Sequence, residues 1–414
     1  MLKYKFNYKV SDFSCVPFFN LGFSYKIYYF LMFLFVPLSI ELYTYFIDSH
    51  FKDKIFDIFF LFYEIYTYEV IFYLIIGLMA FSLGYKTASK KSFIKSNILM
   101  AEWSVRKLFL ISIFLFFLGY IIKVIRFFSG KVNYEMYSDA LSGNPLFTFF
   151  VTPNPLHMIG ILLGIIGFFY SKRIGSTKQK KLFLYTTFLM LSIYLLGIID
   201  LGSKYKMLAP FIFILLIKNI FYPEKKLYKI FLKLFVITLI VFTVDSIKNI
   251  IFYGESNQNT FLEKMTPLIG RVSQVQVVTQ IVKLDEPYLF GHLLLEGNAF
   301  GHKYELIGTN DFKTGVAVTN PGDLYLDFGP IGIIFGLFLL GVVYKLFYIF
   351  ISKTNMFFIL FYPMVWVVII HGVESQLILV FFNIIKVFIL TFIIHLFLIK
   401  FERVKYKKNS NIHR

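Results

Sequence analysis

Long apolar stretches dominate the chain and limit what it can fold into. A helix that crosses about 30 Å of hydrocarbon needs roughly 20 apolar residues. Apolar residues make up 58% of the 414 residues, and the mean hydropathy is +0.71, outside the range of soluble domains. The sequence therefore predicts an all-α polytopic membrane protein with about 10 transmembrane helices. The expected spans are residues 27–47, 63–83, 108–128, 150–170, 182–201, 205–222, 230–250, 328–350, 356–372 and 377–400.

Lys and Arg are unevenly divided between the two sides that these spans define. With ten spans and both termini in the cytoplasm, the inner segments hold 28 of the 42 Lys and Arg but four of the 24 acidic residues. Lys and Arg are retained on the cytoplasmic side of membrane proteins, so this asymmetry sets the orientation. The net charge of +18 is thus explained by topology and by contacts with anionic membrane lipid, and no nucleic acid partner is expected.

One large polar segment of about 75 residues, 252–328, is expected outside the cell membrane. It divides the chain into spans one to seven (1–251), an extracytoplasmic loop (252–328), spans eight to ten (329–400) and a basic cytoplasmic tail (401–414). A helical wheel of residues 260–283 gathers Val275, Val278 and Val282 on an apolar face that also carries Arg271. A guanidinium there needs an anion, either a carboxylate of the loop or a ligand phosphate.

Further cations are expected at the outer rim, where the positive-inside rule makes them unusual. Arg126 ends the third span and is followed by Lys131 and Tyr134, whereas Lys204 lies in the turn after the fifth span, near Asp200. This mixture suits an anionic, sugar-bearing ligand, because Arg binds phosphate bidentately and aromatic faces stack on sugar rings. The alternatives are that Arg126 reaches lipid headgroups and that Asp200 and Lys204 pair with each other.

The late part of the outer loop is rich in Gly, Asn, His and Tyr, and offers Glu296, His302 and Asn320 as ligand-binding groups. No spacing typical of a metal site, a serine nucleophile or a nucleotide-binding loop occurs, so neither a metal nor a cofactor is expected. The eighth span starts with the sequence YLDFGPIGIIFG, whose Gly and Pro residues should break or tighten its first turn. Asp327 would then lie at the outer membrane boundary, beside a half-broken helix that can line a cavity.

The large late outer loop and the re-entry at TNPGDLYLDFGPIGIIFG resemble those of bacterial oligosaccharide repeat-unit polymerases, the Wzy-type O-antigen polymerases. The Gly-Ser-Lys turn at residues 202–204 is similar to that family's Gly-Ser-Arg turn, and LIGRVSQ resembles its loop-helix segment carrying an Arg. The related O-antigen ligases carry an outer His-Asn where this chain has Thr319 and Asn320. That difference favours a polymerase over a ligase.

The resemblance implies a GT-C-like architecture and a metal-independent, inverting glycosyl transfer on the outer face of the bacterial cytoplasmic membrane. A glycan held on undecaprenyl diphosphate would be transferred to the next lipid-linked repeat unit, yielding O-antigen or capsule, with a flippase and a chain-length regulator as partners. We expect Arg271, Lys204 and Asp327 to be catalytic. Substrate contacts are expected from Arg126, Lys131, Tyr134, Asp200, Glu296, His302 and Asn320.

A lipid-linked oligosaccharide flippase or another polysaccharide transporter is the rival interpretation. It would use intramembrane charges such as Glu69 and Lys386 as its pathway and the outer loop as a lid. Against it, the sequence has no internal inverted repeat, which many transporter folds have. A structural subunit of a polysaccharide export complex is a third interpretation.

Overall fold

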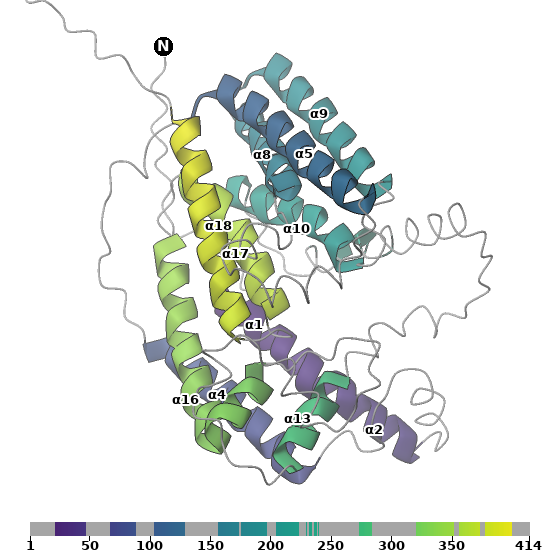
Figure 1. Ribbon diagram of the computed structural model, residues 1–414, viewed down its shortest axis with the longest axis vertical. Coiled ribbons are helices and arrows are strands. Elements are labelled where there is room, and N and C mark those ends of the chain that lie inside the picture. The colour runs from purple at the N-terminus through teal and green to yellow at the C-terminus, as the bar shows by residue number, and fades with distance from the viewer. Residues whose placement is uncertain are drawn as a thin grey trace, which may run out of the picture.

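The structure is a computed structural model that describes residues 21–46, 67–87, 103–128, 156–173, 175–196, 204–222, 273–283, 320–351, 356–372 and 377–399, with scattered residues between 229 and 239. Helices account for nearly all of this part of the chain. Figure 1 shows one group formed by α5, α8, α9 and α10, a second formed by α1, α2, α4, α13 and α16, and α17 and α18 between them.

The helices follow the apolar runs, because inside a membrane each backbone polar group must be satisfied within its own segment. The first helix runs without a break through α1 (Leu21–Phe30), a π-helical turn (Leu31–Phe35) and α2 (Val36–Phe46). Pro37 follows two residues after the end of this wide turn and has no N–H to donate to a regular helix. The remaining helices are α4 (Tyr68–Thr87), α5 (Val105–Phe128), α8 (Leu156–Arg173), α9 (Thr177–Leu196), α10 (Lys204–Phe221), α13 (Ser273–Lys283), α16 (Asn320–Ile351), α17 (Met356–Gly372) and α18 (Leu377–Leu398).

Six of the described helices are long and apolar enough to cross a membrane. They are Leu21–Leu42, Tyr68–Thr87, Val105–Ile122, Leu156–Arg173, Asn320–Tyr348 and Val380–Leu398, and Leu208–Phe221 and Phe357–Ile370 are shorter apolar helices. The prediction of an all-α, multi-pass membrane protein is confirmed at this level. The number of ten spans stays a prediction, and most of the seventh expected span, 230–250, lies outside the described residues.

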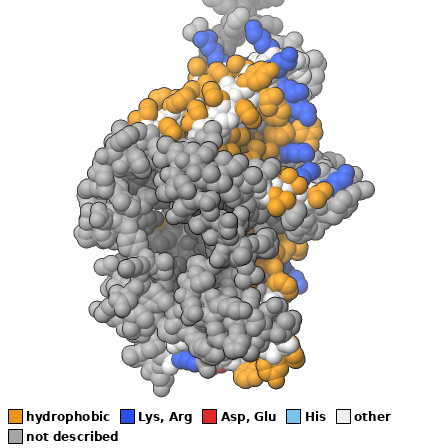
Figure 2. All heavy atoms as spheres, turned by 90° about the vertical axis from the view of Figure 1, so that its right-hand side faces the viewer, with side chains coloured by type: hydrophobic (Ala, Val, Ile, Leu, Met, Phe, Trp, Pro, Cys, Tyr) orange, Lys and Arg blue, Asp and Glu red, His pale blue; other side chains and the backbone are white. Residues whose placement is uncertain are grey.

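Large apolar side chains point away from the bundle on most of these helices. Phe72 and Met79 of α4, Phe114 of α5 and Phe188 of α9 are each 59–69% exposed. Contiguous apolar surface of this kind is rare on soluble monomers and is expected of helices that face lipid. Figure 2 shows this apolar surface on the described helices, with Lys and Arg side chains concentrated toward its upper end.

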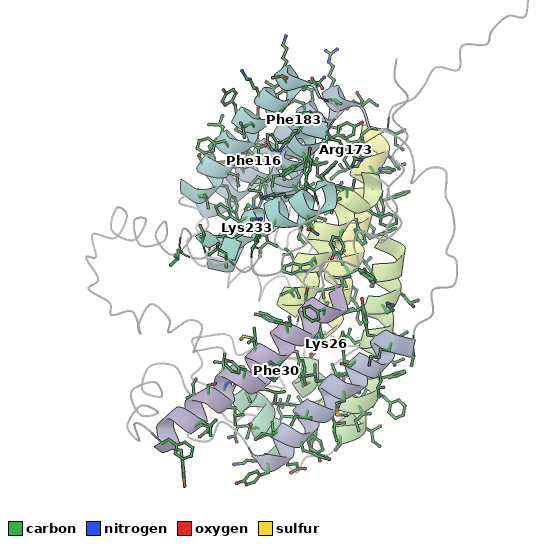
Figure 3. The ribbon with its side chains drawn as sticks, turned by 180° about the vertical axis from the view of Figure 1, so that it is seen from behind. Lys26, Phe30, Phe116, Arg173, Phe183 and Lys233 are labelled. Carbon is green, nitrogen blue, oxygen red and sulfur yellow. The ribbon has the colours of Figure 1, made fainter. Side chains whose placement is uncertain are left out.

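Glycines allow pairs of helices to approach until their backbones touch. A Cβ atom on Gly160 of α8 would lie 2.6 Å from the backbone nitrogen of Phe116 on α5, a residue labelled in Figure 3. On α16, a Cβ atom on Gly341 would lie 2.9 Å from the backbone nitrogen of Tyr85 on α4. Small residues at such contacts are typical of helix packing in membranes.

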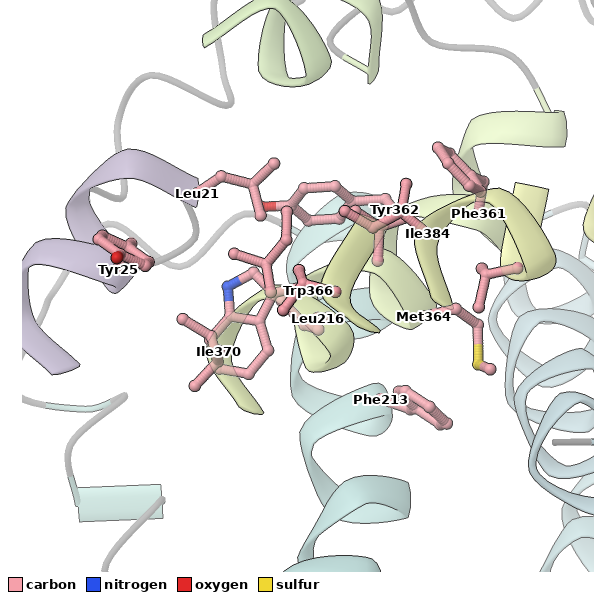
Figure 4. Close-up of a cluster of buried hydrophobic side chains, with 14 of the residues drawn as sticks. Leu21, Tyr25, Phe213, Leu216, Phe361, Tyr362, Met364, Trp366, Ile370 and Ile384 are labelled. Atoms are coloured by element: carbon pink, nitrogen blue, oxygen red, sulfur yellow. The ribbon is translucent and has the colours of Figure 1, made fainter. Parts of the chain in front are cut away.

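Apolar and aromatic side chains join the two groups where α1, α10, α17 and α18 meet (Figure 4). Trp366 of α17 lies in this cluster with Tyr362 and Leu216, and its indole Nε1 donates a hydrogen bond of 3.3 Å to Ser24 Oγ of α1. The buried indole N–H thus has a partner on another helix, as buried Trp residues usually do.

A second link holds the start of α5 against the end of α18. Trp103 Nε1 donates to His395 Nδ1 at 2.9 Å, and Lys107 Nζ donates to the Ile399 carbonyl oxygen at 3.0 Å. Trp103 and Ile399 also form an isolated antiparallel bridge. The start of α5 and the end of α18 therefore lie at the same end of the molecule, as the predicted topology requires.

Candidate functional site

Helix α16 is broken at Gly329, whose φ of 64° and ψ of −153° are not helical. These angles fall in a region that essentially only Gly occupies. A Cβ atom on Gly332 would meet the carbonyl oxygen of Leu324, so the seven residues between them do not form a straight helix. The segment Asn320–Phe328, called the half-helix below, folds back along the rest of α16. The predicted break near these Gly and Pro residues is confirmed.

The half-helix is buried along its length except at Phe328, which is 40% exposed beside the turn. It carries three polar side chains inside the bundle, Asn320, Asp323 and Asp327, which are 0%, 3% and 0% exposed. Their spacing of three and four residues places them on one face of the helix. Buried carboxylates in a membrane protein are costly and usually mark a functional site.

The helix dipole distinguishes the two carboxylates. Asp323 lies in the first turn of the half-helix, where the positive end of the dipole stabilises a negative charge. Asp327 lies in the last turn of the half-helix, two residues before the break at Gly329, where the negative end of the same dipole disfavours a carboxylate. The dipole thus favours a carboxylate at Asp323 and disfavours one at Asp327, which makes Asp327 the stronger candidate for chemistry.

Helix α13 packs on α16 and α4. Val275, Val278 and Ile281 of α13 are buried, which confirms the predicted apolar face for the two valines. Thr279 is also 0% exposed, and its hydroxyl donates to the Val275 carbonyl oxygen at 3.0 Å, which satisfies it within the helix. Arg271 comes two residues before the first residue of α13 and lies outside the described residues.

The structure brings together two of the residues predicted to form the site. Asn320 and Asp327, which we expected to bind substrate and to act in catalysis, share the buried face of the half-helix. Asp323 was not among the predicted site residues, because residues 320–328 were expected to belong to the outer loop and not to a helix that would place Asp323 on one face with Asn320 and Asp327. Helix α16 begins at Asn320, earlier than the expected start of the span at Phe328. The helical spacing of Asn320, Asp323 and Asp327 is the signal in the sequence that could have identified Asp323.

The other predicted site residues are placed only in part. Lys204 is the first residue of α10 and Arg126 lies in the last turn of α5, and only the backbone is described at both positions. The residues outside the described part of the chain are Lys131, Tyr134, Asp200, Arg271, Glu296 and His302.

The two charges assigned to a transport pathway lie on different helices. Glu69 is exposed in the first turn of α4, where it accepts a hydrogen bond of 2.7 Å from Tyr73 Oη. Lys386 of α18 is 8% exposed, as expected for a cation that faces the bundle interior.

No group of three or more His, Cys, Asp or Glu residues able to hold a metal ion occurs within the described helices. Among the described residues, the half-helix offers a buried polar face with two carboxylates, and α13 packs on the helix that contains it. No protein-family model, curated protein or solved structure matches this chain.

Proposed function

We propose that the protein is a glycosyltransferase that polymerises undecaprenyl-diphosphate-linked oligosaccharide repeat units on the outer face of the bacterial cytoplasmic membrane. The observation that carries the proposal is the packing of α13 on α16, the helix that contains the half-helix. Arg271 comes two residues before the first residue of α13, and the half-helix holds Asp327 in the bundle. A diphosphate leaving group needs a cation, for which Arg271 is the candidate, and an attacking hydroxyl needs a base, for which Asp327 is the candidate. Because the helix that follows Arg271 packs on the helix that carries Asp327, the arrangement supports the proposed reaction.

In the proposed reaction, Asp327 accepts the proton of a sugar hydroxyl at the nonreducing end of the acceptor repeat unit. The hydroxyl oxygen forms a bond to the anomeric carbon of the donor glycan. The bond from that carbon to the diphosphate breaks, and the diphosphate leaves with the electron pair. Arg271, together with Lys204 and Arg126, stabilises the charge that develops on the diphosphate, without a metal ion.

Extension of lipid-diphosphate-linked repeat units by the purified protein tests this proposal. We expect the glycan to lengthen in the presence of EDTA and without any nucleotide. Asp327→Asn should reduce the rate by about 10²–10⁴, the usual contribution of a general base. The matched control is Asp323→Asn on the same face, which should keep extension but lower the free energy of unfolding by about 0.3–1 kcal/mol because the dipole loses its carboxylate. A strict need for Mg²⁺ or nucleotide sugar, or full activity of Asp327→Asn, would contradict the mechanism.

Arg271 is tested by two substitutions that differ in geometry. Arg271→Ala should slow extension by about 10²–10³, the typical effect of losing one contact that stabilises developing charge. Arg271→Lys should keep part of the activity, because it keeps the charge but loses the planar fork. Loss of folded Arg271→Ala protein would instead indicate an internal salt bridge.

A transporter of lipid-linked oligosaccharides is the second candidate, because a helix broken inside the bundle is also typical of transporters. The break at Gly329 is the observation that favours it. The surface glycan of a deletion strain separates the two functions. Single capped repeat units indicate a polymerase, whereas the absence of surface glycan indicates a flippase.

A further inference from the structure

Among the described residues, three buried polar side chains lack hydrogen-bond partners near the start of the half-helix. Tyr25 of α1 and Asn320 and Tyr344 of α16 are each 0% exposed. Within the described part of the chain, no hydrogen bond satisfies Tyr25 Oη, Tyr344 Oη, or either polar atom of the Asn320 amide. Buried polar groups in proteins are nearly always satisfied by protein or by ordered water.

These side chains converge from three segments of the chain. The rings of Tyr25 and Tyr344 pack edge to face with their centroids 5.3 Å apart. The Tyr25 hydroxyl lies beside the Asn320 amide, although the two do not meet the geometry of a hydrogen bond. Asn320 and Tyr344 both reach Tyr25 only because the half-helix folds back at Gly329.

The chemistry of the cluster favours a small neutral partner. An amide and two hydroxyls can both donate and accept, which is what water needs from its neighbours. An anion is disfavoured, because Asp323 and Asp327 follow on the same face. A cation is disfavoured as well, because the first turn of the half-helix carries the positive end of its dipole. Leaving one such group without any partner would cost about 1–3 kcal/mol.

We propose that the start of the half-helix is a water-binding site inside the bundle, formed by Tyr25, Tyr344 and Asn320. The polar face that begins there continues through Asp323 to Asp327 over about 10 Å, at 1.5 Å per residue. Bound water thus gives the Asn320 end of this polar face a hydrogen-bonding neighbour. The site does not depend on whether the protein polymerises or transports glycans.

Radiolytic hydroxyl-radical labelling of the intact protein in detergent, read by mass spectrometry, tests the site. Water bound beside a tyrosine generates the radical that oxidises it, even where bulk solvent does not reach. Tyr29 is the matched control, because it lies one turn from Tyr25, is 0% exposed and donates its hydroxyl to the Leu74 carbonyl oxygen at 3.3 Å. We expect Tyr25 and Tyr344 to be oxidised several-fold faster than Tyr29. Equal rates for Tyr25 and Tyr29 would overturn the proposal.

Two variants show whether the residues share the same water. In Asn320→Leu the amide is replaced by an apolar side chain of similar size, and Tyr25 labelling should fall to the level of Tyr29. Tyr344→Phe removes one oxygen atom and should also lower Tyr25 labelling. This second variant keeps the test available if Asn320→Leu does not fold. Unchanged Tyr25 labelling in Tyr344→Phe would contradict a shared site. A higher unfolding temperature for Tyr25→Phe would also contradict it, because it would indicate a dry, unsatisfied hydroxyl.

Discussion

The break in α16 makes one substitution especially informative, Gly329→Ala. At φ 64° and ψ −153° an added Cβ atom clashes with the backbone, and holding a residue other than Gly in such a region costs about 1–3 kcal/mol. The chain has two responses to this strain. It either keeps the fold-back and loses that amount of stability, or it straightens α16.

Straightening costs more than the strain it relieves. A continuous helix of 32 residues is about 48 Å long, well beyond the roughly 30 Å of hydrocarbon, so the half-helix would project into water. Leu324 and Leu326, now 3% and 8% exposed, would lose their packing, at about 1.5–3 kcal/mol for each side chain. We therefore expect Gly329→Ala to retain the fold-back and to be less stable by about 1–3 kcal/mol.

Unfolding by SDS in mixed micelles, followed by tryptophan fluorescence, measures this difference. Phe328→Ala is the control, because it alters the neighbouring, partly exposed residue without changing the backbone requirement. Maleimide labelling of Leu326→Cys in a Cys15→Ser background reports the fold-back itself, and the thiol should stay protected in both variants. If Gly329→Ala unfolds at the same SDS fraction as Phe328→Ala, the residue is not held in the conformation described here.

Other features of the molecule give further tests. Trp103→Phe removes the donor to His395 and should lower the free energy of unfolding by about 0.5–1.5 kcal/mol, measured in the same SDS titration; an unchanged midpoint would mean that the bond is absent. Gly84→Leu should prevent α4 from packing on α16, because even a Cβ atom there would meet the Phe338 carbonyl oxygen, and folded yield should drop more than for Ser82→Ala on the same helix. Cysteines at Gly254 and Gly301, in a chain without Cys15, should react with an impermeant reagent from outside intact cells; protection of either position until lysis would refute the proposed topology.

The membrane helices were predictable because their signal is local. About 20 apolar residues in a row suffice to identify a span, whatever it packs against. Apart from the seventh, each expected span overlaps a described helix, and the ends agree for α17 (356–372) but differ by up to several residues elsewhere. The break at Gly329 was also predictable, since it depends on the conformational range of single residues such as Gly and Pro.

The burial of the half-helix was not predictable from the same signals. The sequence around Asn320 contains Pro, Gly and two Asp residues, which is typical of an outer loop and gives no reason to expect a position inside a bundle. The burial of its side chains, and the return of Leu324 onto Gly332 and Gly336 of the same helix, show in the structure that this segment is enclosed. Tyr25 gave no signal at all, because its part in the polar cluster depends on contacts with residues about 300 positions away in the chain.

The packing of α13 determines which experiments can isolate the chemistry of the site. Val275, Val278 and Ile281 cover part of α16 and α4, and exposing them to water would cost about 1.5–3 kcal/mol for each side chain. Deleting the outer loop would therefore remove Arg271 and weaken the helix that holds Asp327 in a single step. Loss of activity in such a deletion would not separate catalysis from packing. Substitutions at Arg271 and Asp327 leave the buried face of α13 intact, so a loss of extension at normal protein levels can be assigned to the reacting groups.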